Sequence, residues 1–342
     1  MAMSEGADIL YLNADDVLGC AVTPAEMNAA VEQAFLASAC GEARTRPALS
    51  MMAGPGASFR AKGAVLGTMG YAAVKWYGYF PQNTARGRAE YCPLILLNET
   101  RAGFPVAMIE ATWITAVRTA AIVGVGARWL ASGEAQRATF VGCGVQARAA
   151  LEALLPGSAL TSAVALSRRR ESAEAFADFA RQLGVETEVS EDPRRALAQS
   201  DIVVTSVPRQ SPRTGFLDAG WLKPGAFVAM VDYGVSWKAE SLAQLNRCFA
   251  DDAEQAAIRA EHGDVVVSFA AGLADVIGRA KPGRLAPEER IALLVSGTGL
   301  ADAAAAALVY ERARALGLGQ SLSLCGTRGA PASAQTEVVG AV

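Results

Sequence analysis

The feature that most constrains this chain is a glycine-rich segment, Gly142–Ala147 (GCGVQA), between a short apolar run and a helical pattern. Gly142 permits a tight turn, Gly144 lets the backbone approach a pyrophosphate, and Ala147 lets the helix pack closely against a sheet. Free N–H groups at the start of that helix favour a bound anion. Because a strand precedes the motif, and a helix and then a further strand follow it, the segment predicts a dinucleotide-binding turn. We assign Gly142, Gly144, Val145, Gln146 and Ala147 to it.

From residue 138 onward, short apolar strands alternate with helical patterns. The expected strands are 138–141, 163–167, 201–207, 226–231 and 247–250, and the expected helices are 145–155, 171–183, 193–199 and 240–245. This alternation predicts an α/β fold with a parallel, doubly wound sheet of the Rossmann type. At the end of the third strand, Thr205, Ser206 and Val207 are further candidates for the cofactor site.

The N-terminal part has a different pattern, and one helix of that pattern returns near the C-terminus. Thr23 and Glu26 enclose Pro24 in a capping box, which predicts a helix N-terminus. The other expected elements are a mainly β segment over 60–110 with a hairpin formed by 93–98 and 104–109, a helix over 115–132, and an Ala-rich helix over 299–316.

These patterns predict two domains. An α+β domain for substrate binding and dimerisation comprises 1–125 and 299–324, and the Rossmann domain comprises 126–298. Residues 325–342 mix Gly, Pro, Ala, Ser and Thr and are expected to form a flexible tail. A cleft between the two domains is the natural place for a substrate to meet a cofactor.

Composition restricts the partners. The 342 residues are 52% hydrophobic and 19% charged, which suits well-filled globular cores. A net charge of −3 gives no basic field for nucleic acid or an anionic membrane, so the expected partner is a small molecule. The N-terminus lacks the features of a signal peptide, and no apolar run reaches about 18 residues, so no membrane span is expected.

The six cysteines have no CxxC spacing. They are interpreted as reduced thiols of a cytoplasmic protein, with a disulfide framework as the alternative. The single histidine, His262, lies in a polar run and is expected at a solvated helix end. No metal site is predicted, since one histidine cannot form a His-rich zinc site. Acid–base chemistry is therefore assigned to Lys, Asp, Glu or Tyr.

The residues after the second expected strand indicate which dinucleotide binds. An Asp or Glu at this point binds the ribose 2′-hydroxyl of NAD, but the chain has Ser167, Arg168 and Arg169 here. A guanidinium can bind a 2′-phosphate through two hydrogen bonds. The sequence therefore predicts a preference for NADP(H), with NAD(H) as the second choice. The other interpretation is a solvated basic surface at a helix start.

Several blocks together resemble the ornithine cyclodeaminase/mu-crystallin family, over about residues 8 to 320. They are Lys75-Trp-Tyr-Gly-Tyr-Phe-Pro81-Gln-Asn83-Thr84-Ala-Arg86, Gly103-x-Pro105, Ile114-Thr115-Ala-Val-Arg118-Thr119-Ala120-Ala121 and Gly142-x-Gly144-x-Gln146-Ala147. The order and spacing of these blocks make the resemblance specific.

The resemblance implies a homodimer in which an N-terminal substrate domain joins a Rossmann domain. It also implies chemistry at the Cα–N bond of α-amino acids, assisted by a nicotinamide. Arg46 and Arg118 resemble the pair that binds the substrate carboxylate, and Lys75 resembles the catalytic lysine. Thr84 resembles a residue that lines cofactor and substrate. Asn83 and Gly297 fall in matching blocks with less defined roles, and we assign Asn83 to the substrate and Gly297 to the cofactor.

The residue chemistry agrees with this assignment. Two arginines can hold an α-carboxylate and aim the α-carbon at the nicotinamide. Lys75 lies in an apolar run, where burial would lower its pKa and suit it to proton transfer. Other interpretations remain open: Arg46 as a surface charge, Lys75 as a half-buried strand lysine whose ammonium reaches solvent, and Arg118 in a structural ion pair.

One segment departs from the family pattern. Ornithine cyclodeaminases carry an aspartate in a block like GGDxPGK, and counting back from Lys238 puts Gly234 at that position. Asp232 lies two residues earlier, which on a strand keeps the same face, so Asp232 is predicted to reach the site as a catalytic residue. A purely structural Asp232 is the alternative.

The sequence thus predicts an NADP(H)-dependent reductase or dehydrogenase that acts on an α-imino or α-amino acid. One alternative is a cyclodeaminase, a lyase that releases ammonia and recycles NAD. The other is a small-ligand binding protein of the mu-crystallin type, against which the joint presence of Lys75, Arg46 and Arg118 argues.

Overall fold

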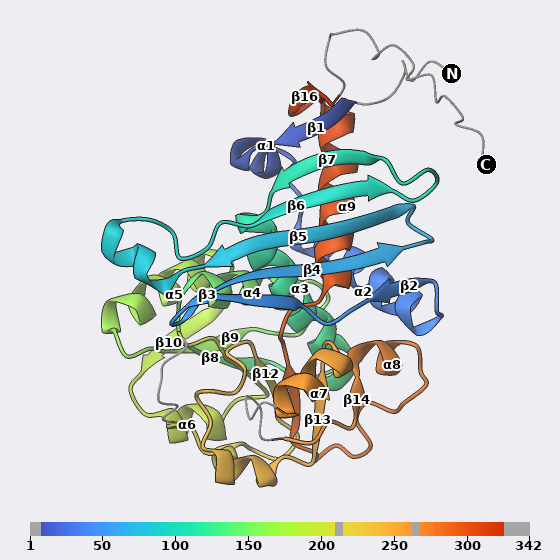
Figure 1. Ribbon diagram of the computed structural model, residues 1–342. Coiled ribbons are helices and arrows are strands. Elements are labelled where there is room, and N and C mark those ends of the chain that lie inside the picture. The colour runs from blue at the N-terminus through green and yellow to red at the C-terminus, as the bar shows by residue number, and fades with distance from the viewer. Residues whose placement is uncertain (1–7, 209–214, 262–266, 325–342) are drawn as a thin grey trace, which may run out of the picture.

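The computed structural model describes residues 8–208, 215–261 and 267–324, which form two sheets with their covering helices (Figure 1). His262 and the expected tail over 325–342 lie outside the described residues. Of the helices in the described part, none is long and apolar enough to span a bilayer.

The first sheet is built mostly from the N-terminal part of the chain. Its order is β16-β1-β7-β6-β5-β4-β2, and β3 pairs with β4. The strands are β1 (Asp8–Leu12), β2 (Ala43–Thr45), β3 (Leu49–Gly54), β4 (Ala57–Leu66), β5 (Tyr71–Tyr79), β6 (Leu94–Glu99), β7 (Pro105–Glu110) and β16 (Gln320–Ser323). The predicted β segment and the hairpin formed by β6 and β7 are confirmed.

One face of this sheet is covered by helices. α9 (Gly299–Leu316) runs across β4, β5 and β6, and it packs against α2 (Pro24–Ala39) and α3 (Thr112–Leu130). The predicted capping box at Thr23 begins α2, and α9 has the predicted bounds. Short α1 (Ala14–Gly19) and 3₁₀ helix η1 (Pro81–Arg86) complete this part.

The second sheet is parallel throughout, with the order β10-β9-β8-β11-β12-β15-β13-β14, as the alternation predicted. Its strands are β8 (Arg137–Val141), β9 (Ser162–Leu166), β10 (Glu186–Ser190), β11 (Ile202–Thr205), β12 (Phe227–Met230), β13 (Arg247–Ala250), β14 (Ala271–Gly272) and β15 (Ile291–Leu294). Since β8 lies between β9 and β11, the strand order reverses at β8, where such sheets bind ligands.

The helices of the second sheet are α4 (Val145–Leu154), α5 (Arg170–Gln182), α6 (Pro193–Ala198), α7 (Ala253–Glu261) and α8 (Leu273–Ile277), with 3₁₀ helices η2 (Ala219–Trp221) and η3 (Ala239–Gln244). The α-helix expected over 240–245 is thus a 3₁₀ helix. The predicted domain boundary at 125/126 falls inside α3, and the division into domains stays a prediction.

Close packing of α3 against α4 leads to a stability prediction. A Cβ on Gly124 of α3 would collide with the carbonyl oxygen of Ala153 on α4. Although alanine is the better helix former, Gly124→Ala should lower the free energy of unfolding by about 1–3 kcal/mol, because the helices must separate. Urea unfolding measures this. Gly133→Ala, at an exposed turn where a Cβ meets nothing within 4 Å, is the control. Equal stability of the two variants would contradict the prediction.

Candidate functional site

The glycine-rich turn joins β8 to α4 at the point where the strand order reverses. Gly142 has φ +85°, and a Cβ there would lie 2.8 Å from the carbonyl oxygen of Ser206, so glycine is required. A Cβ on Gly144 would meet nothing within 4 Å, which leaves open space above the backbone. Ala147 is fully buried against the sheet. These features fit a dinucleotide pyrophosphate at the start of α4.

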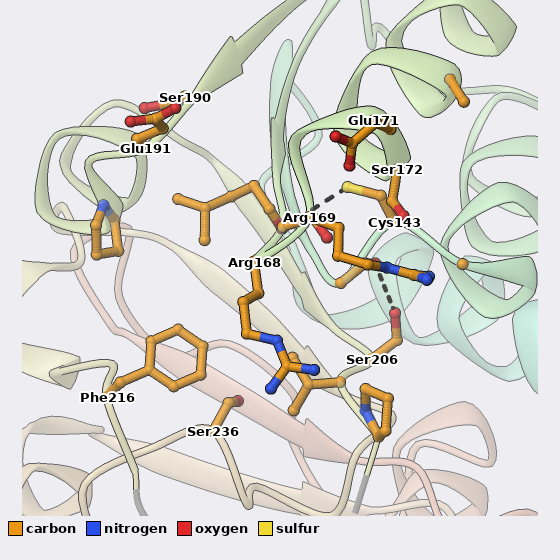
Figure 2. A pocket seen from close by; sticks show the side chains of 18 of the residues that line it. Cys143, Arg168, Arg169, Glu171, Ser172, Ser190, Glu191, Ser206, Phe216 and Ser236 are labelled. Atoms are coloured by element: carbon orange, nitrogen blue, oxygen red, sulfur yellow. Dashed lines mark hydrogen bonds between the residues drawn. The ribbon is translucent and has the colours of Figure 1, made fainter.

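A cavity of about 1180 Å³, the larger cavity, lies beside this turn (Figure 2). Its lining includes the predicted cofactor residues Gly142, Gly144, Ser167, Arg168, Arg169, Ser206 and Val207. Thr205, Val145 and Gln146 are placed differently. Thr205 is buried behind the lining, Val145 is 70% exposed, and Gln146 lines a second cavity.

Two arginines of the larger cavity are free to bind an anion. Arg170 forms ion pairs with Glu174 and Glu191, whereas Arg168 and Arg169 form none with the residues described. Arg168 extends toward Phe216 and Ser236 (Figure 2). Glu171 and Glu191 also line this cavity, so the field around the arginines is mixed in sign.

A second cavity of about 400 Å³, the smaller cavity, adjoins the larger one. The two share Val207 and Pro208, which follow β11 after Ser206. The smaller cavity is lined from both halves of the molecule, by residues that include Arg60, Lys62, Lys75, Tyr77, Glu90, Arg118, Gln146, Asp232, Tyr233 and Ser296. A ligand here would therefore lie next to one bound at the glycine-rich turn.

Lys75 and Arg118 meet at a buried carboxylate in this cavity wall. Asp302 Oδ1 lies 2.7 Å from Lys75 Nζ and 2.7 Å from Arg118 Nε. Lys75 and Asp302 are 1% exposed, and Arg118 is 4% exposed. Arg118 Nη1 has no hydrogen-bond partner among the described residues, and it is buried next to Gly297. The predicted pair Lys75 and Arg118 is thus brought together.

Burial and neighbouring charges shift the titration of this cluster. Burial, together with the charge of Arg118, lowers the pKa of Lys75 to about 7, although Asp302 opposes the shift. Burial alone would raise the pKa of Asp302, but Arg118, Lys75 and Lys62 outweigh it and hold that pKa below its usual value. Asp302 therefore stays ionised, while Lys75 can exchange a proton near neutral pH.

Lys62 and Asp251 hold the chain that leads into α9. Lys62 donates to the carbonyl oxygens of Ser296 and Gly297 at 2.8 and 2.6 Å. Asp251 accepts from the amides of the same two residues. Gly297 has φ +73°, and a Cβ there would collide with the guanidinium of Arg118. Gly297 was expected to bind the cofactor. The structure instead places it against Arg118, outside the lining of the larger cavity.

Asp232 lines the smaller cavity, but the strand expected around it ends earlier. β12 stops at Met230, and residues 231–236 form a turn with left-handed backbone at Tyr233 and Gly234. The argument that an offset of two residues keeps the same strand face is therefore wrong. Asp232 accepts from Thr205 Oγ1 at 2.8 Å and from the Gly234 amide at 3.0 Å. Burial raises the pKa of its carboxyl.

Three predicted substrate residues line neither of these two cavities, and Arg46 instead lines a separate cavity of about 520 Å³. The Arg46 side chain is 87% exposed and lies 3.9 Å from Glu254. In η1, Thr84 donates to the carbonyl of Pro81, and Asn83 donates to that of Ala89. Instead, the residues that sequence reasoning missed are Arg60, Lys62, Asp251 and Asp302. Asp302 had one visible signal, as the single acid in the Ala-rich stretch 299–309 of α9.

Known proteins share this fold and this arrangement of motifs. A model of the ornithine cyclodeaminase/mu-crystallin family matches residues 11–317, and the chain belongs to this family. It is 30% identical to alanine dehydrogenase of Archaeoglobus fulgidus, over 92% of this chain and 98% of that protein.

Two solved structures are similar over nearly the whole chain. One is Thermococcus litoralis Δ1-pyrroline-2-carboxylate reductase in complex with NADH and L-proline, with a TM-score of 0.82 and 27% identity over 92% of this chain and all of that one. The other is an archaeal alanine dehydrogenase dimer with bound NAD, with a TM-score of 0.83 and 28% identity over 93% of this chain and all of that one.

The buried cluster gives a second stability prediction. Asp302→Asn leaves Lys75 and Arg118 buried without a counter-charge, so the free energy of unfolding should fall by about 3–5 kcal/mol. Glu174→Gln removes only the exposed pair with Arg170 and should cost about 0.5 kcal/mol or less. Chemical denaturation of both variants checks the contrast, and a loss below about 1 kcal/mol for Asp302→Asn would contradict it.

Proposed function

We propose that this protein is a nicotinamide-dependent reductase or dehydrogenase that acts on the Cα–N bond of an α-imino or α-amino acid. The observation that carries the proposal is the shared wall at Val207 and Pro208, which joins a cavity at a dinucleotide turn to one that holds Lys75 and Arg118. The similar proteins named above, an alanine dehydrogenase and an imino-acid reductase, support the same chemistry.

The residues present suit each step of such a reaction. When bound, a reduced nicotinamide supplies the hydride that adds to Cα of an imine. Arg118 holds the α-carboxylate from the wall of the smaller cavity, and this fixes the α-carbon toward the larger cavity. Lys75, with its pKa lowered to about 7, gives a proton to the imine nitrogen, and in the reverse direction it takes one from the amine.

The finer choice of cofactor rests on the two arginines that form no ion pair in the described part of the chain. A 2′-phosphate beside Arg168 and Arg169 gains charge-assisted hydrogen bonds, whereas a 2′-hydroxyl finds no acid there at Ser167. We therefore propose a preference for NADP(H), with NAD(H) as the weaker cofactor. The named structures contain NADH and NAD, so this chain is expected to differ from them.

We also propose a homodimer. The uncovered face of the first sheet exposes eight large apolar side chains, Leu49, Met51, Phe59, Val65, Val74, Trp76, Leu94 and Leu96. Contiguous exposed apolar surface of this kind marks interaction sites, and the similar archaeal enzyme is a dimer. Sedimentation at micromolar concentration should give twice the monomer mass of 35.5 kDa, and a monomer would contradict the proposal.

A cytoplasmic location and the predicted two-domain division belong to the same proposal. The described cysteines, at 20, 40, 92, 143 and 248, are free thiols, which suits a reducing compartment.

The first functional prediction concerns cofactor choice. Replacing Arg168 and Arg169 by alanine should weaken NADPH binding by about 1.5–3 kcal/mol for each charged hydrogen bond lost, and should leave NADH binding nearly unchanged. Titration calorimetry with both cofactors measures the difference. Arg101→Ala, in the exposed turn between β6 and β7, is the control. Equal affinity of the unmutated protein for NADPH and NADH would refute the preference.

The second functional prediction concerns Lys75. A panel of cyclic imines, and of α-keto acids with amines, should consume NADPH, and Lys75→Met should lower turnover about 10²–10⁴-fold. The reductive rate should fall as pH rises through about 7, since protonated Lys75 is the donor. The oxidative rate should rise over the same range, since neutral Lys75 is the acceptor.

Absorbance at 340 nm separates the alternatives. Ammonia release from ornithine without net change in absorbance would identify a cyclodeaminase. Ligand binding with no reaction of either kind would identify a binding protein. A Lys75→Met variant with near-normal turnover would leave Lys75 without a catalytic role.

A further inference from the structure

The smaller cavity holds more positive charge than one α-carboxylate requires. Four cationic side chains line it, namely Arg60, Lys62, Lys75 and Arg118. Asp302 forms ion pairs with Lys75 and Arg118, while Arg60 and Lys62 have no carboxylate partner within the described ranges. Of the two acids in the lining, Asp232 is held by Thr205 and the Gly234 amide, and Glu90 pairs with none of the four.

We infer that the substrate carries a second carboxylate, on its side chain, and that Arg60 and Lys62 bind it. This inference rests on the proposed function, and it names the substrate class as an amino or imino dicarboxylic acid.

The strand register places the two cations in line with the reacting centre. Arg60 and Lys62 are two residues apart on β4 and therefore share a face. Across to β5, Lys62 is paired with Lys75, and Arg60 is paired with Tyr77. One step of two residues along the sheet covers about 7 Å. A short side chain that extends from an α-carbon beside Lys75 thus passes Lys62 and reaches toward Arg60.

Each of the two cations has donors left for a ligand. Lys62 spends two of its three hydrogens on the carbonyls of Ser296 and Gly297, and one remains. Arg60 donates through Nε to Ser58 Oγ at 3.2 Å and also hydrogen-bonds the Tyr77 side chain, which leaves some of its five N–H donors for a ligand. Lys62 is only 7% exposed, and burial lowers the pKa of its ammonium although Asp302 and Asp251 oppose the shift, so a bound carboxylate would further stabilise the charged form.

Selectivity follows from the same charges. A substrate with an uncharged side chain would cover Arg60 and Lys62 without replacing the water that they lose. A dicarboxylic substrate replaces that water with charge-assisted hydrogen bonds. A site built for such bonds discriminates strongly against an analogue that lacks the group.

Two matched pairs of amino acids test the inference in the oxidative direction with NADP: L-aspartate against L-2-aminobutyrate, and L-glutamate against L-norvaline. In at least one pair, kcat/KM for the acid should exceed that for its uncharged partner by about 10- to 100-fold, the effect of one or two charged hydrogen bonds. Arg60→Met should lower that ratio at least about tenfold. Arg44→Met, on exposed β2 outside the cavity, should leave the ratio unchanged.

Arg60 is the better first variant, because Lys62 also holds the Ser296–Gly297 segment. Lys62→Met, assayed on protein shown to be folded by circular dichroism, should lower the same ratio. If kcat/KM for the uncharged amino acids equals that for the acids in both pairs, the inference is wrong and the proposed function still stands. No oxidation or reduction of any amino or imino acid would overturn both.

Discussion

The carboxylate of Asp302 is the interaction on which the rest of the site depends. It extends from the first turn of α9 and binds Lys75 of β5 and Arg118 of α3, so three elements from distant parts of the chain meet at one oxygen atom. Without this charge, two cations would be buried side by side at high electrostatic cost. With it, Lys75 keeps a pKa near neutrality, and Arg118 is held in the wall of the smaller cavity.

The sequence predicted the second sheet well because glycine geometry and alternation are local signals. The turn at Gly142 and the bounds of α9 follow from residues that adjoin one another. Three strands of this sheet, β10, β14 and β15, were not predicted. β10 contains one apolar residue, Val189, and β14 and β15, with two and four residues, are too short to have a periodicity of their own. The turn after β12 was taken for strand because the left-handed backbone begins at Tyr233, a residue type that gives no turn signal, and reaches Gly234 only afterwards.

The candidate site was predictable only where it coincides with a motif. Lys75 and Arg118 lie in recognisable sequence blocks, and both contact Asp302. Arg46, which was assigned from the segment Thr45-Arg46-Pro47, points to solvent near Glu254. Asp302 was missed, because its role depends on how α9 crosses the sheet, and nothing in the spacing of residues 75, 118 and 302 encodes that crossing. Lys62 was missed because only the register of β4 and β5 places it opposite Lys75.

Three consecutive residues, the last residue of β11 and the two that follow it, connect the two cavities. The hydroxyl of Thr205 binds Asp232 on the smaller cavity, the hydroxyl of Ser206 binds the carbonyl oxygen of Gly142 at the glycine-rich turn, and Val207 lines both cavities. A ligand that shifts the glycine-rich turn therefore acts on the same short segment that positions Asp232. Because that segment leaves a buried parallel strand, it has little freedom to absorb such a shift. One short segment thus contacts both cavities through three neighbouring side chains.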